Sequence, residues 1–472
     1  MGSRLEMERC MHKMFYPDGV AVVGASANPD NMGRNIVQNL ITWQYEGPVY
    51  PVNPGGDDVH GLKGYRSLAD INGPVDLVVA FVPARVIPSV MDECAKMGVR
   101  YMAIPSGGFS EHGEGGDALT GEVRDKAADY GIRFVGPNGL TIINAENGLC
   151  LPFLTIRKRD PGRISIISQS GGVGMSLIMF LDNASRGFNK FVSIGNKVNM
   201  DELDFLEYLG RDPGTEVVCM FLESVVRGRK FVEVASRVEK PVLVYKANTT
   251  EIGARAASSH TAALANDDAV LDGMIRQSGA IRVRSIKNLV NMARAFELPL
   301  MRGDNIAVVS QAGGYAVMTS DIAYRCGFRF PAFSEGMLSG LKEHVRADVI
   351  NMGNPLDLGD ILSSDAIVYA LDRVMAQEQV DGVVAVLLRR ADSKYDGAYA
   401  RLSREVYADL GAIIERYEKP LALALVTQCT YFHDVQSRMP FPLFESPEDA
   451  VEALSVLRQY HRRQAGRERV ER

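Results

Sequence analysis

Short apolar runs recur along the chain at intervals that leave room for a helix between them, and this alternation constrains the fold most. The runs are apolar at successive positions rather than at every second one, as expected of parallel strands that helices cover on both faces. Alternation of such strands with amphipathic stretches predicts doubly wound α/β domains. The runs that carry this prediction are Val20–Val23, Val75–Val82, Ile164–Ile167, Val217–Leu222, Val242–Tyr245, Ile306–Val309, Val383–Leu388 and Leu421–Val426.

Two segments of the chain repeat each other. Ile164–Phe188 and Ile306–Phe328 each read as a strand, a Ser-Gln-small-Gly-Gly loop and a helix that closes on Gly-Phe. The repetition predicts two copies of an α/β unit of about 140–160 residues, with chance convergence of short strand motifs as the alternative. Three further landmarks recur in the same order, namely Ile194-Gly195-Asn196 with Met352-Gly353-Asn354, Val217–Leu222 with Val383–Leu388, and Lys240-Pro241 with Lys419-Pro420.

The length and the repeat together predict three domains. A chain of 472 residues corresponds to roughly three domains at about 150 residues each. Stretches rich in charge, Pro and Gly near Arg157–Gly162 and Pro299–Asp304 are typical of boundaries. We therefore expect a Rossmann-like domain over residues 14–157, followed by doubly wound parallel-sheet domains over residues 158–299 and 300–460.

Composition excludes several classes of protein. Fifty-two basic and 58 acidic residues give a net charge of −6, which provides no basic footprint for nucleic acid. The six cysteines are scattered without a C-x-x-C pair, so neither a disulfide framework nor a zinc or other metal site is expected. The sequence contains no apolar run near the ~20 residues that cross a membrane, and its first residues lack the apolar core of a signal peptide. We expect a cytoplasmic protein without a membrane or nucleic-acid partner.

Loops after the first strands indicate a ligand crevice in the first domain. The first strand runs into Gly24-Ala25-Ser26, and a helix is expected to begin near Gly33. A glycine turn before a helix start lets a phosphate approach the backbone. An NAD site would place Asp or Glu after the second strand, where Asn53 and Pro54 stand, so a nicotinamide dehydrogenase is disfavoured. Ordinary strand–helix turns are the alternative. The later loops that we expect at the same edge contain Val82, Pro83, Ser106, Gly107 and Asn138.

The two repeated glycine loops are candidate phosphate sites. Consecutive small residues expose backbone amides, and the helix that follows adds about half a positive charge at its start. Two such helix starts facing each other could hold a phosphoryl group without a lysine. Glycines that only form tight turns are the alternative for either loop taken singly. The candidate residues are Ser170, Gly171 and Gly172 in the first copy and Ala312, Gly313 and Gly314 in the second.

One of the seven histidines has unusual neighbours. His260 lies among small uncharged residues in Ala256–Ala265, which would let a phosphate approach the imidazole closely. A helix N-terminus capped by Ser258 or Ser259, with the histidine incidental, is the alternative. An imidazole becomes a covalent nucleophile when a carboxylate fixes its tautomer. Glu223, at the end of the Val217–Leu222 run, is the candidate carboxylate, and Arg389 stands at the matching place in the second copy.

Together these motifs resemble the α subunit of NDP-forming acyl-CoA synthetases of the ADP-forming acetyl-CoA synthetase type, which are relatives of succinyl-CoA synthetase. The resemblance covers about residues 14–459 and is carried by motifs that are specific in combination. They are Val22–Ser26, Tyr50–Pro54, Gly136-Pro137-Asn138, Ser168–Gly171, Ala257–Thr261 and Asn354–Leu358.

The resemblance implies a phosphoryl relay. It implies that a carboxylic acid, CoA and ATP interconvert with acyl-CoA, ADP and phosphate through an acyl phosphate and a phosphohistidine. The first domain would hold CoA, and the two domains after it would be flavodoxin-like. His260 would carry the phosphoryl group, Glu223 would orient the imidazole, and the helices near Gly171 and Gly313 would bind phosphate.

Several residues depart from the family pattern. Ala262 and Asn266 replace glycines of the histidine loop, so the loop is expected to be stiffer. Gly139 replaces a common cysteine, and Gly55 replaces a lysine expected to contact CoA. We find no segment long enough for an ATP-grasp domain, so the resemblance implies an ATP-grasp β subunit that binds nucleotide and Mg²⁺, in an α₂β₂ assembly. A non-catalytic CoA or acyl-CoA sensor is the alternative function.

Overall fold

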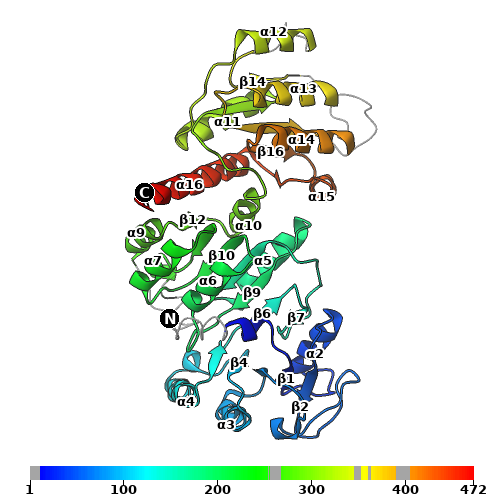
Figure 1. Cartoon of the computed structure of the whole chain (residues 1–472), viewed down its shortest axis with the longest axis vertical. Coiled ribbons are helices and arrows are strands. Elements are labelled where there is room, and N and C mark those ends of the chain that lie inside the picture. The colour runs from blue at the N-terminus through cyan, green and yellow to red at the C-terminus, as the bar shows by residue number, and fades with distance from the viewer. Residues whose placement is uncertain are drawn as a thin grey trace. The chain divides into compact units, whose positions relative to one another are not determined.

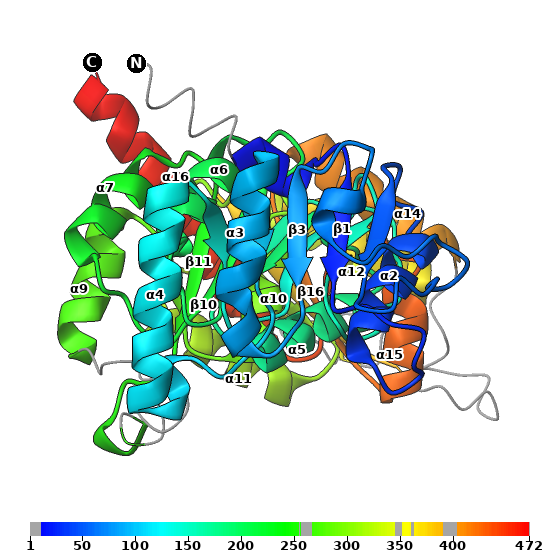
Figure 2. The ribbon, with the colours of Figure 1, turned by 90° about the horizontal axis from the view of Figure 1, so that it is seen from below.

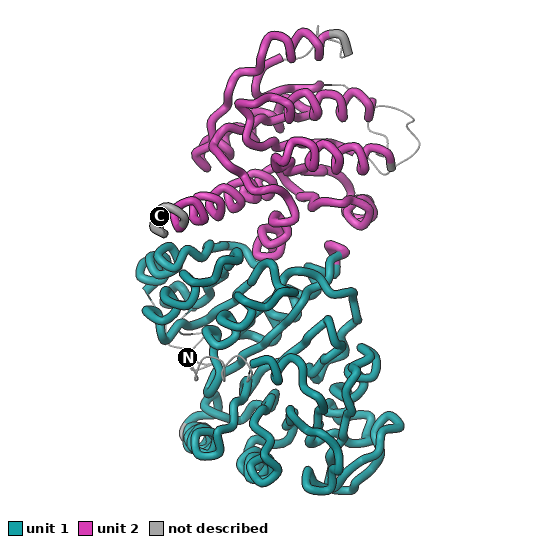
Figure 3. Tube along the Cα trace, in the orientation of Figure 1, with its two compact units in different colours: residues 1–182, 186–286 teal, residues 183–185, 287–472 magenta. Residues whose placement is uncertain are grey.

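The computed structural model describes residues 11–253, 255, 267–344, 352–359, 363–389 and 404–471. The described residues form three β-sheets, and the chain divides into two compact units (Figure 3). The first unit, which includes residues 11–182 and 186–253, holds two of the sheets, and the second unit, mainly residues 287–471, holds the third. None of the helices in these ranges is long and apolar enough to cross a membrane.

The first sheet is parallel and has helices on both faces, as the sequence predicts. Alternate residues of its first strand, β1, enter different cores, because Val20 and Val22 pack with α2 (Met32–Thr42), whereas Ala21 packs with α3 (Ile87–Met97). Helix α3 lies beside α4 (Glu114–Tyr130) (Figure 2). The strands are β1 (Val20–Val23), β2 (Val49–Val52), β3 (Leu77–Ala80), β4 (Tyr101–Ala103) and β5 (Arg133–Val135), in the order β2-β1-β3-β4-β5.

The second sheet combines five parallel strands with an antiparallel hairpin at its edge (Figure 1). The hairpin comes from residues that the sequence analysis assigned to the first domain. Antiparallel edge strands are common on otherwise parallel sheets. The order is β12-β11-β10-β8-β9-β6-β7, with β6 (Thr141–Asn144), β7 (Leu149–Cys150), β8 (Ile164–Ser168), β9 (Lys190–Ser193), β10 (Val217–Leu222), β11 (Val242–Lys246) and β12 (Ile281–Val283). The helices are α5 (Gly171–Asn183), α6 (Glu202–Arg211), α7 (Gly228–Arg237) and α9 (Asp268–Ser278).

The third sheet is parallel throughout, in the order β14-β13-β15-β16-β17. Its strands are β13 (Ile306–Ser310), β14 (Leu356–Asp357), β15 (Gly382–Leu388), β16 (Leu421–Val426) and β17 (Leu443–Phe444). The helices are α10 (Ile286–Ala295), α11 (Gly313–Arg325), α12 (Glu335–His344), α13 (Ser364–Met375), α14 (Arg404–Tyr417), α15 (Cys429–Gln436) and α16 (Pro447–Glu471).

All three sheets share one order for their parallel strands, in which the first strand lies between the second and the third. Ligands of open parallel sheets bind outside the carboxyl ends of the strands, where the strand order reverses. The shared order therefore gives each sheet one such switch point, at β1/β3, at β8/β10 and at β13/β15. The doubly wound α/β class expected from the sequence is confirmed, while the division into domains at residues 157 and 299 stays a prediction.

Hydrogen bonds between strands correct two landmarks of the repeat. Ile194 N–H donates to Ser168 O (2.9 Å) after β9, and the matching bond in the third sheet runs from Leu358 N–H to Ser310 O (2.7 Å). Leu358-Gly359 is therefore the counterpart of Ile194-Gly195, and the expected match with Met352-Gly353-Asn354 is wrong. That triplet precedes β14, whereas Ile194-Gly195 follows β9, because similar letters do not fix strand register.

The match between β10 and β15 is also shifted by one residue. Val218 N–H donates to Pro241 O and Val383 N–H donates to Pro420 O, both at 2.9 Å, so Val218 corresponds to Val383. The same shift makes Leu388, and not Arg389, the counterpart of Glu223. The Lys-Pro landmark agrees with the structure, because each lysine donates to a backbone carbonyl oxygen near the end of the matching helix, α6 before β10 and α13 before β15. Lys240 reaches Leu209 O (3.1 Å) and Lys419 reaches Met375 O (3.0 Å).

Candidate functional site

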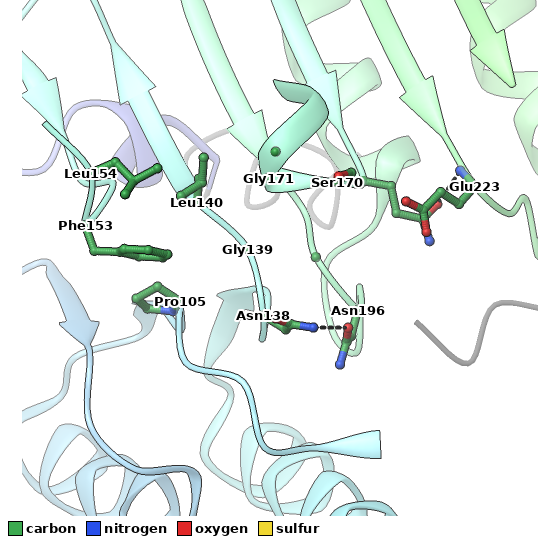
Figure 4. Close-up of a pocket in the computed structure, with 13 residues that line it drawn as sticks. Pro105, Asn138, Gly139, Leu140, Phe153, Leu154, Ser170, Gly171, Asn196 and Glu223 are labelled. Carbon is green, nitrogen blue, oxygen red and sulfur yellow. Dashed lines mark hydrogen bonds between the residues drawn. The ribbon is translucent and has the colours of Figure 1, made fainter. Parts of the chain in front are cut away.

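A cavity of about 320 Å³ lies at the carboxyl edge of the second sheet, beside the switch point between β8 and β10 (Figure 4). This volume falls in the range of small-molecule sites. The start of α5 and the end of β10 line one side of the cavity, and loops that follow β4, β5 and β7 line the other. The lining residues are Pro105, Asn138, Gly139, Leu140, Phe153, Leu154, Gln169, Ser170, Gly171, Gly172, Gly195, Asn196 and Glu223.

Gln169 links the ends of β8 and β10 at the switch point of the second sheet. Its buried side-chain oxygen accepts hydrogen bonds from the backbone N–H groups of Glu223 (2.9 Å) and Ser224 (3.1 Å), and its own backbone N–H donates to Phe221 O (2.9 Å). Gln311 forms the same bridge in the third sheet, where its side-chain oxygen accepts from Leu388 N–H (3.1 Å). The Ser-Gln pair that repeats in the sequence therefore joins the first and third strands of each sheet, and in the second sheet it fixes the backbone of Glu223.

The first predicted phosphate loop opens into the cavity. Ser170, Gly171 and Gly172 lie at the start of α5, and all three line the cavity. A Cβ on Gly172 would meet no atom within 4 Å, so the backbone of this residue is open to a ligand. Because a helix start carries about half a positive charge, this end of the cavity favours an anion.

The second predicted phosphate loop has different surroundings. Ala312, Gly313 and Gly314 stand at the start of α11, in the second unit. A Cβ on Gly313 would lie 2.8 Å from the Asp357 carboxylate. Asp357 corresponds to Ser193 of the second sheet. Asp357 pairs with Ser310, the last residue of β13, and Ser193 pairs with Ser168, the last residue of β8. The Asp357 carboxylate thus stands near the start of α11, and its negative charge disfavours the binding of phosphate there.

Glu223 lies at the end of β10 and faces the cavity (Figure 4). Lys246 ends the neighbouring strand β11, and its ammonium group donates to Glu223 O (2.8 Å) and to Ala247 O. Burial lowers the pKa of Lys246 to about 8, in agreement with a residue that is 5% exposed. Lys246 thereby joins the ends of β10 and β11. His260 lies outside the described residues, in the segment between the end of β11 and the start of α9.

A polar network supports the wall of the cavity between the two sheets of the first unit. Asn138 donates to the side chain of Asn196 (3.3 Å), and Asn196 donates to Glu111 (2.6 Å). A Cβ on Gly195 would lie 2.1 Å from Pro137 O, so only glycine fits there. A Cβ on Gly139 would lie 2.8 Å from the Ser193 carbonyl oxygen, which gives a local reason for a glycine at this position.

Glu111 anchors this network with its charge. Burial alone would raise the pKa of Glu111, but hydrogen bonds from backbone N–H groups, including that of Gly108 (2.7 Å), and from Asn196 lower it below its ordinary value. A carboxyl group with a lowered folded-state pKa stabilises the fold above its unfolded pKa, and the contribution is lost as the pH falls through the folded pKa.

We therefore expect Glu111→Gln to lower the free energy of unfolding by about 1–2 kcal/mol at neutral pH and to have a smaller effect at pH 3 than at neutral pH. Urea unfolding of the wild type and the variant at both pH values measures the difference. Glu122→Gln, on α4, serves as the control. A difference for Glu111→Gln that is equal at both pH values would contradict the assignment.

The first sheet has its own switch point, between β1 and β3, where the turn around Gly24 lies. Gly24 has φ +94°, and a Cβ there would lie 2.2 Å from Phe81 O. A Cβ on Gly33 would lie 2.9 Å from Gly24 O, so the start of α2 packs directly against the turn. These contacts agree with a turn through which a phosphate-bearing ligand approaches the backbone.

Asn31 holds this turn, and the sequence analysis missed it. Its side chain caps α2 by accepting from Arg34 N–H (2.9 Å), accepts from Ser26 N–H (3.3 Å), and donates to Gly24 O (3.0 Å). An Asn directly before an expected helix start is a recognisable N-cap signal, so this residue was within reach of sequence reasoning.

The other predicted ligand residues of the first domain follow strands of the first sheet. Asn53 is buried, and its amide is bonded to the backbone of Asp57, with Nδ2 donating to the carbonyl oxygen (2.9 Å) and Oδ1 accepting from the N–H (3.0 Å). Ser106 donates to Val82 O (2.7 Å), which joins the ends of β3 and β4. Ala25 lies in the turn after β1, and Pro54, Pro83 and Gly107 lie in the loops after β2, β3 and β4. Of the predicted ligand residues in this domain, Asn138 lines the cavity.

Comparisons with known proteins agree with this arrangement. The family model described as "CoA binding domain" matches residues 18–145, and "Succinyl-CoA ligase like flavodoxin domain" matches residues 161–296. The α subunit of ADP-forming acetate–CoA ligase I of Pyrococcus furiosus is 34% identical over 95% of this chain and 97% of its own length. The α subunit of ligase II of that organism is 36% identical over 73% and 75%. The structure of acetyl-coenzyme A synthetase 1 of Ca. Korarchaeum cryptofilum with phosphate and ADP has a TM-score of 0.86 and 30% identity, over 96% of this chain and 97% of that one.

Proposed function

Because this chain belongs to the family of ADP-forming acetate–CoA ligase α subunits, we propose that it is the half of an acyl-CoA synthetase that binds CoA and the acid. A partner subunit with an ATP-grasp domain supplies ATP or ADP and Mg²⁺, in an α₂β₂ assembly. The reaction joins a carboxylic acid to CoA, splits ATP to ADP and phosphate, and runs in both directions.

The relay has three steps, each of which transfers one group. An imidazole nitrogen of His260 attacks the terminal phosphorus of ATP, a nitrogen–phosphorus bond forms, and ADP leaves. A carboxylate oxygen of the acid then attacks that phosphorus, which forms the acyl phosphate and frees the imidazole. The CoA thiolate finally attacks the acyl carbon, the thioester forms, and phosphate leaves.

The observation that carries this proposal is the position of Glu223. Its carboxylate and the start of α5 line one cavity. The chain that leads to His260 leaves β11 at the same edge, where Ala247 N–H donates to Leu222 O (2.9 Å). In the proposed site, Glu223 accepts a hydrogen bond from one imidazole nitrogen, which fixes the tautomer and leaves the other nitrogen free to attack. The start of α5 stabilises the phosphoryl charge.

We assign the CoA substrate to the crevice of the first sheet. The turn around Gly24 and the start of α2 at Gly33 would receive its phosphate groups, and Val82, Pro83 and Ser106 would line the path toward the cavity. The position directly after β2, where an NAD site would have Asp or Glu, is occupied by Asn53, which supports CoA over NAD.

Reconstitution with an ATP-grasp subunit tests this function. The mixture should form acyl-CoA only when acid, CoA and ATP are all present, and it should form ATP from acyl-CoA, ADP and phosphate. CoA binding without either reaction would favour a CoA or acyl-CoA sensor. Tight binding of NADH in place of CoA would contradict the proposal.

A further inference from the structure

The cavity at the second sheet has two chemically different sides (Figure 4). Pro105, Leu140, Phe153 and Leu154 form an apolar wall, and Asn138, Ser170, Asn196 and Glu223 lie across from it. We propose that the apolar wall receives the hydrocarbon part of the acid, and that the substrate is a monocarboxylic acid with an uncharged apolar tail larger than a methyl group. The inference rests on the proposed function, because it names the acid that this site takes.

Part of the wall is held in place by one face of a helix. Asn35 and Asn39 on α2 and Trp43 directly after it are spaced by four residues, and all three donate to backbone carbonyl oxygens of the strap, which we define as residues 151–156. The bonds run from Asn35 Nδ2 to Phe153 O (3.0 Å), from Asn39 Nδ2 to Pro152 O and Leu154 O (both 2.8 Å), and from Trp43 Nε1 to Ile156 O (2.9 Å). These bonds use the backbone of the strap and leave the side chains of Phe153 and Leu154 to line the cavity.

The Phe153 ring is also fixed from behind. It stacks on Phe81, the residue after β3, with ring centroids 5.1 Å apart and planes 19° apart. Leu154 is 41% exposed, so it presents apolar surface that a bound ligand can cover. A pre-formed apolar wall gains affinity from each carbon that it buries. The single methyl group of acetate is too small to cover four apolar side chains.

Charge narrows the class of acid further. Among the described residues that line the cavity, Glu223 is ionisable, and none is Lys, Arg or His. A second carboxylate at the far end of a dicarboxylic acid would lie against apolar side chains without a cation, which is costly. Dicarboxylic acids such as succinate are therefore excluded from the preferred class.

Titration of the full chain with CoA thioesters tests the wall without a partner subunit. Isothermal titration with free CoA, acetyl-CoA, 3-methylbutanoyl-CoA and succinyl-CoA gives four affinities on one protein. We expect 3-methylbutanoyl-CoA to bind at least about tenfold more tightly than acetyl-CoA, since each buried carbon contributes severalfold. Succinyl-CoA should bind no more tightly than acetyl-CoA.

Variants locate the preference on the wall. Leu154→Ala and Phe153→Ala should bring the ratio of the two affinities close to one and leave free CoA binding unchanged. Ile41→Ala is the matched control, because Ile41 is also 41% exposed but lies near the end of α2. Since Leu154 is substantially exposed, its alanine variant is expected to fold even if Phe153→Ala does not.

These measurements distinguish failure of the wall assignment from failure of the proposed function. Equal affinities for acetyl-CoA and 3-methylbutanoyl-CoA, or a preference that survives both wall variants, would overturn the assignment of the wall while CoA binding still stood. Failure of the wild-type chain to bind free CoA would overturn the proposed function and the wall assignment with it.

Discussion

Replacing His260 with alanine is expected to abolish acyl-CoA formation by the reconstituted enzyme, with a loss of at least about 10³-fold in kcat. In the proposed relay the variant removes the atom that carries the phosphoryl group, and loss of an essential nucleophile commonly costs several orders of magnitude. The loss should appear in both directions of the reaction, because the same phosphohistidine is used in each. Coupled assays of acyl-CoA and of ATP formation measure it.

The control for this variant is His461→Ala, which changes a histidine in α16. It should keep wild-type rates and show that loss of a histidine as such is harmless. The His260 variant should still bind CoA, since the proposed CoA site lies at the switch point of the first sheet. Measurable turnover by His260→Ala at more than about one-tenth of the wild-type rate would contradict the relay.

Lys190→Met is expected to destabilise the first unit by about 3–5 kcal/mol, because it leaves a buried carboxylate without its cation. Lys190 is fully buried at the start of β9, where its ammonium group contacts Asp212 (2.8 Å), Asn189 (2.7 Å) and Glu146 (3.3 Å). Thr215 also donates to Asp212 (2.6 Å). The free energy of unfolding in urea, followed through the transition of the first unit, measures the loss.

Two controls separate the buried pair from surface charges. Arg163 and Glu216 form an ion pair with side chains that are 75% and 50% exposed, so Arg163→Met should cost less than about 1 kcal/mol. The double variant Lys190→Met/Asp212→Leu removes both charges and should recover part of the loss. Equal destabilisation by Lys190→Met and Arg163→Met would show that the buried cluster contributes nothing special.

The fold was accessible from the sequence because its signal is local. Runs such as Val217–Leu222 are apolar throughout, and this pattern is enough to predict parallel strands covered on both faces. Strand register depends on hydrogen bonds between distant segments, so the repeat was detected but misaligned at Met352-Gly353-Asn354 and at Glu223. Gly-Asn occurs in both triplets, and this similarity led to the wrong alignment. The hydrogen bond from Leu358 N–H to Ser310 O shows that Leu358-Gly359 is the true counterpart of Ile194-Gly195.

Part of the candidate site could also be predicted from the sequence, because its signal is local. A glycine loop before a helix is visible in a few adjacent residues, and Ser170–Gly172 do line the cavity. The apolar wall was not visible, because Phe153 and Leu154 follow no motif and gain their position from donors on α2 more than one hundred residues away. Asn196 was missed for a similar reason, since its contacts with Asn138 and Glu111 link segments far apart in the chain.

The relay through His260 is tested most directly by following the phosphoryl group itself. The full chain, its ATP-grasp partner and γ-³²P-labelled ATP would be mixed without acid or CoA, and the labelled peptide would be mapped at alkaline pH, where phosphohistidine survives. We expect the label on His260, its disappearance when acid and CoA are added, and no label on His260→Ala. Label on another residue, or equal labelling of the His260→Ala chain, would contradict the proposed mechanism.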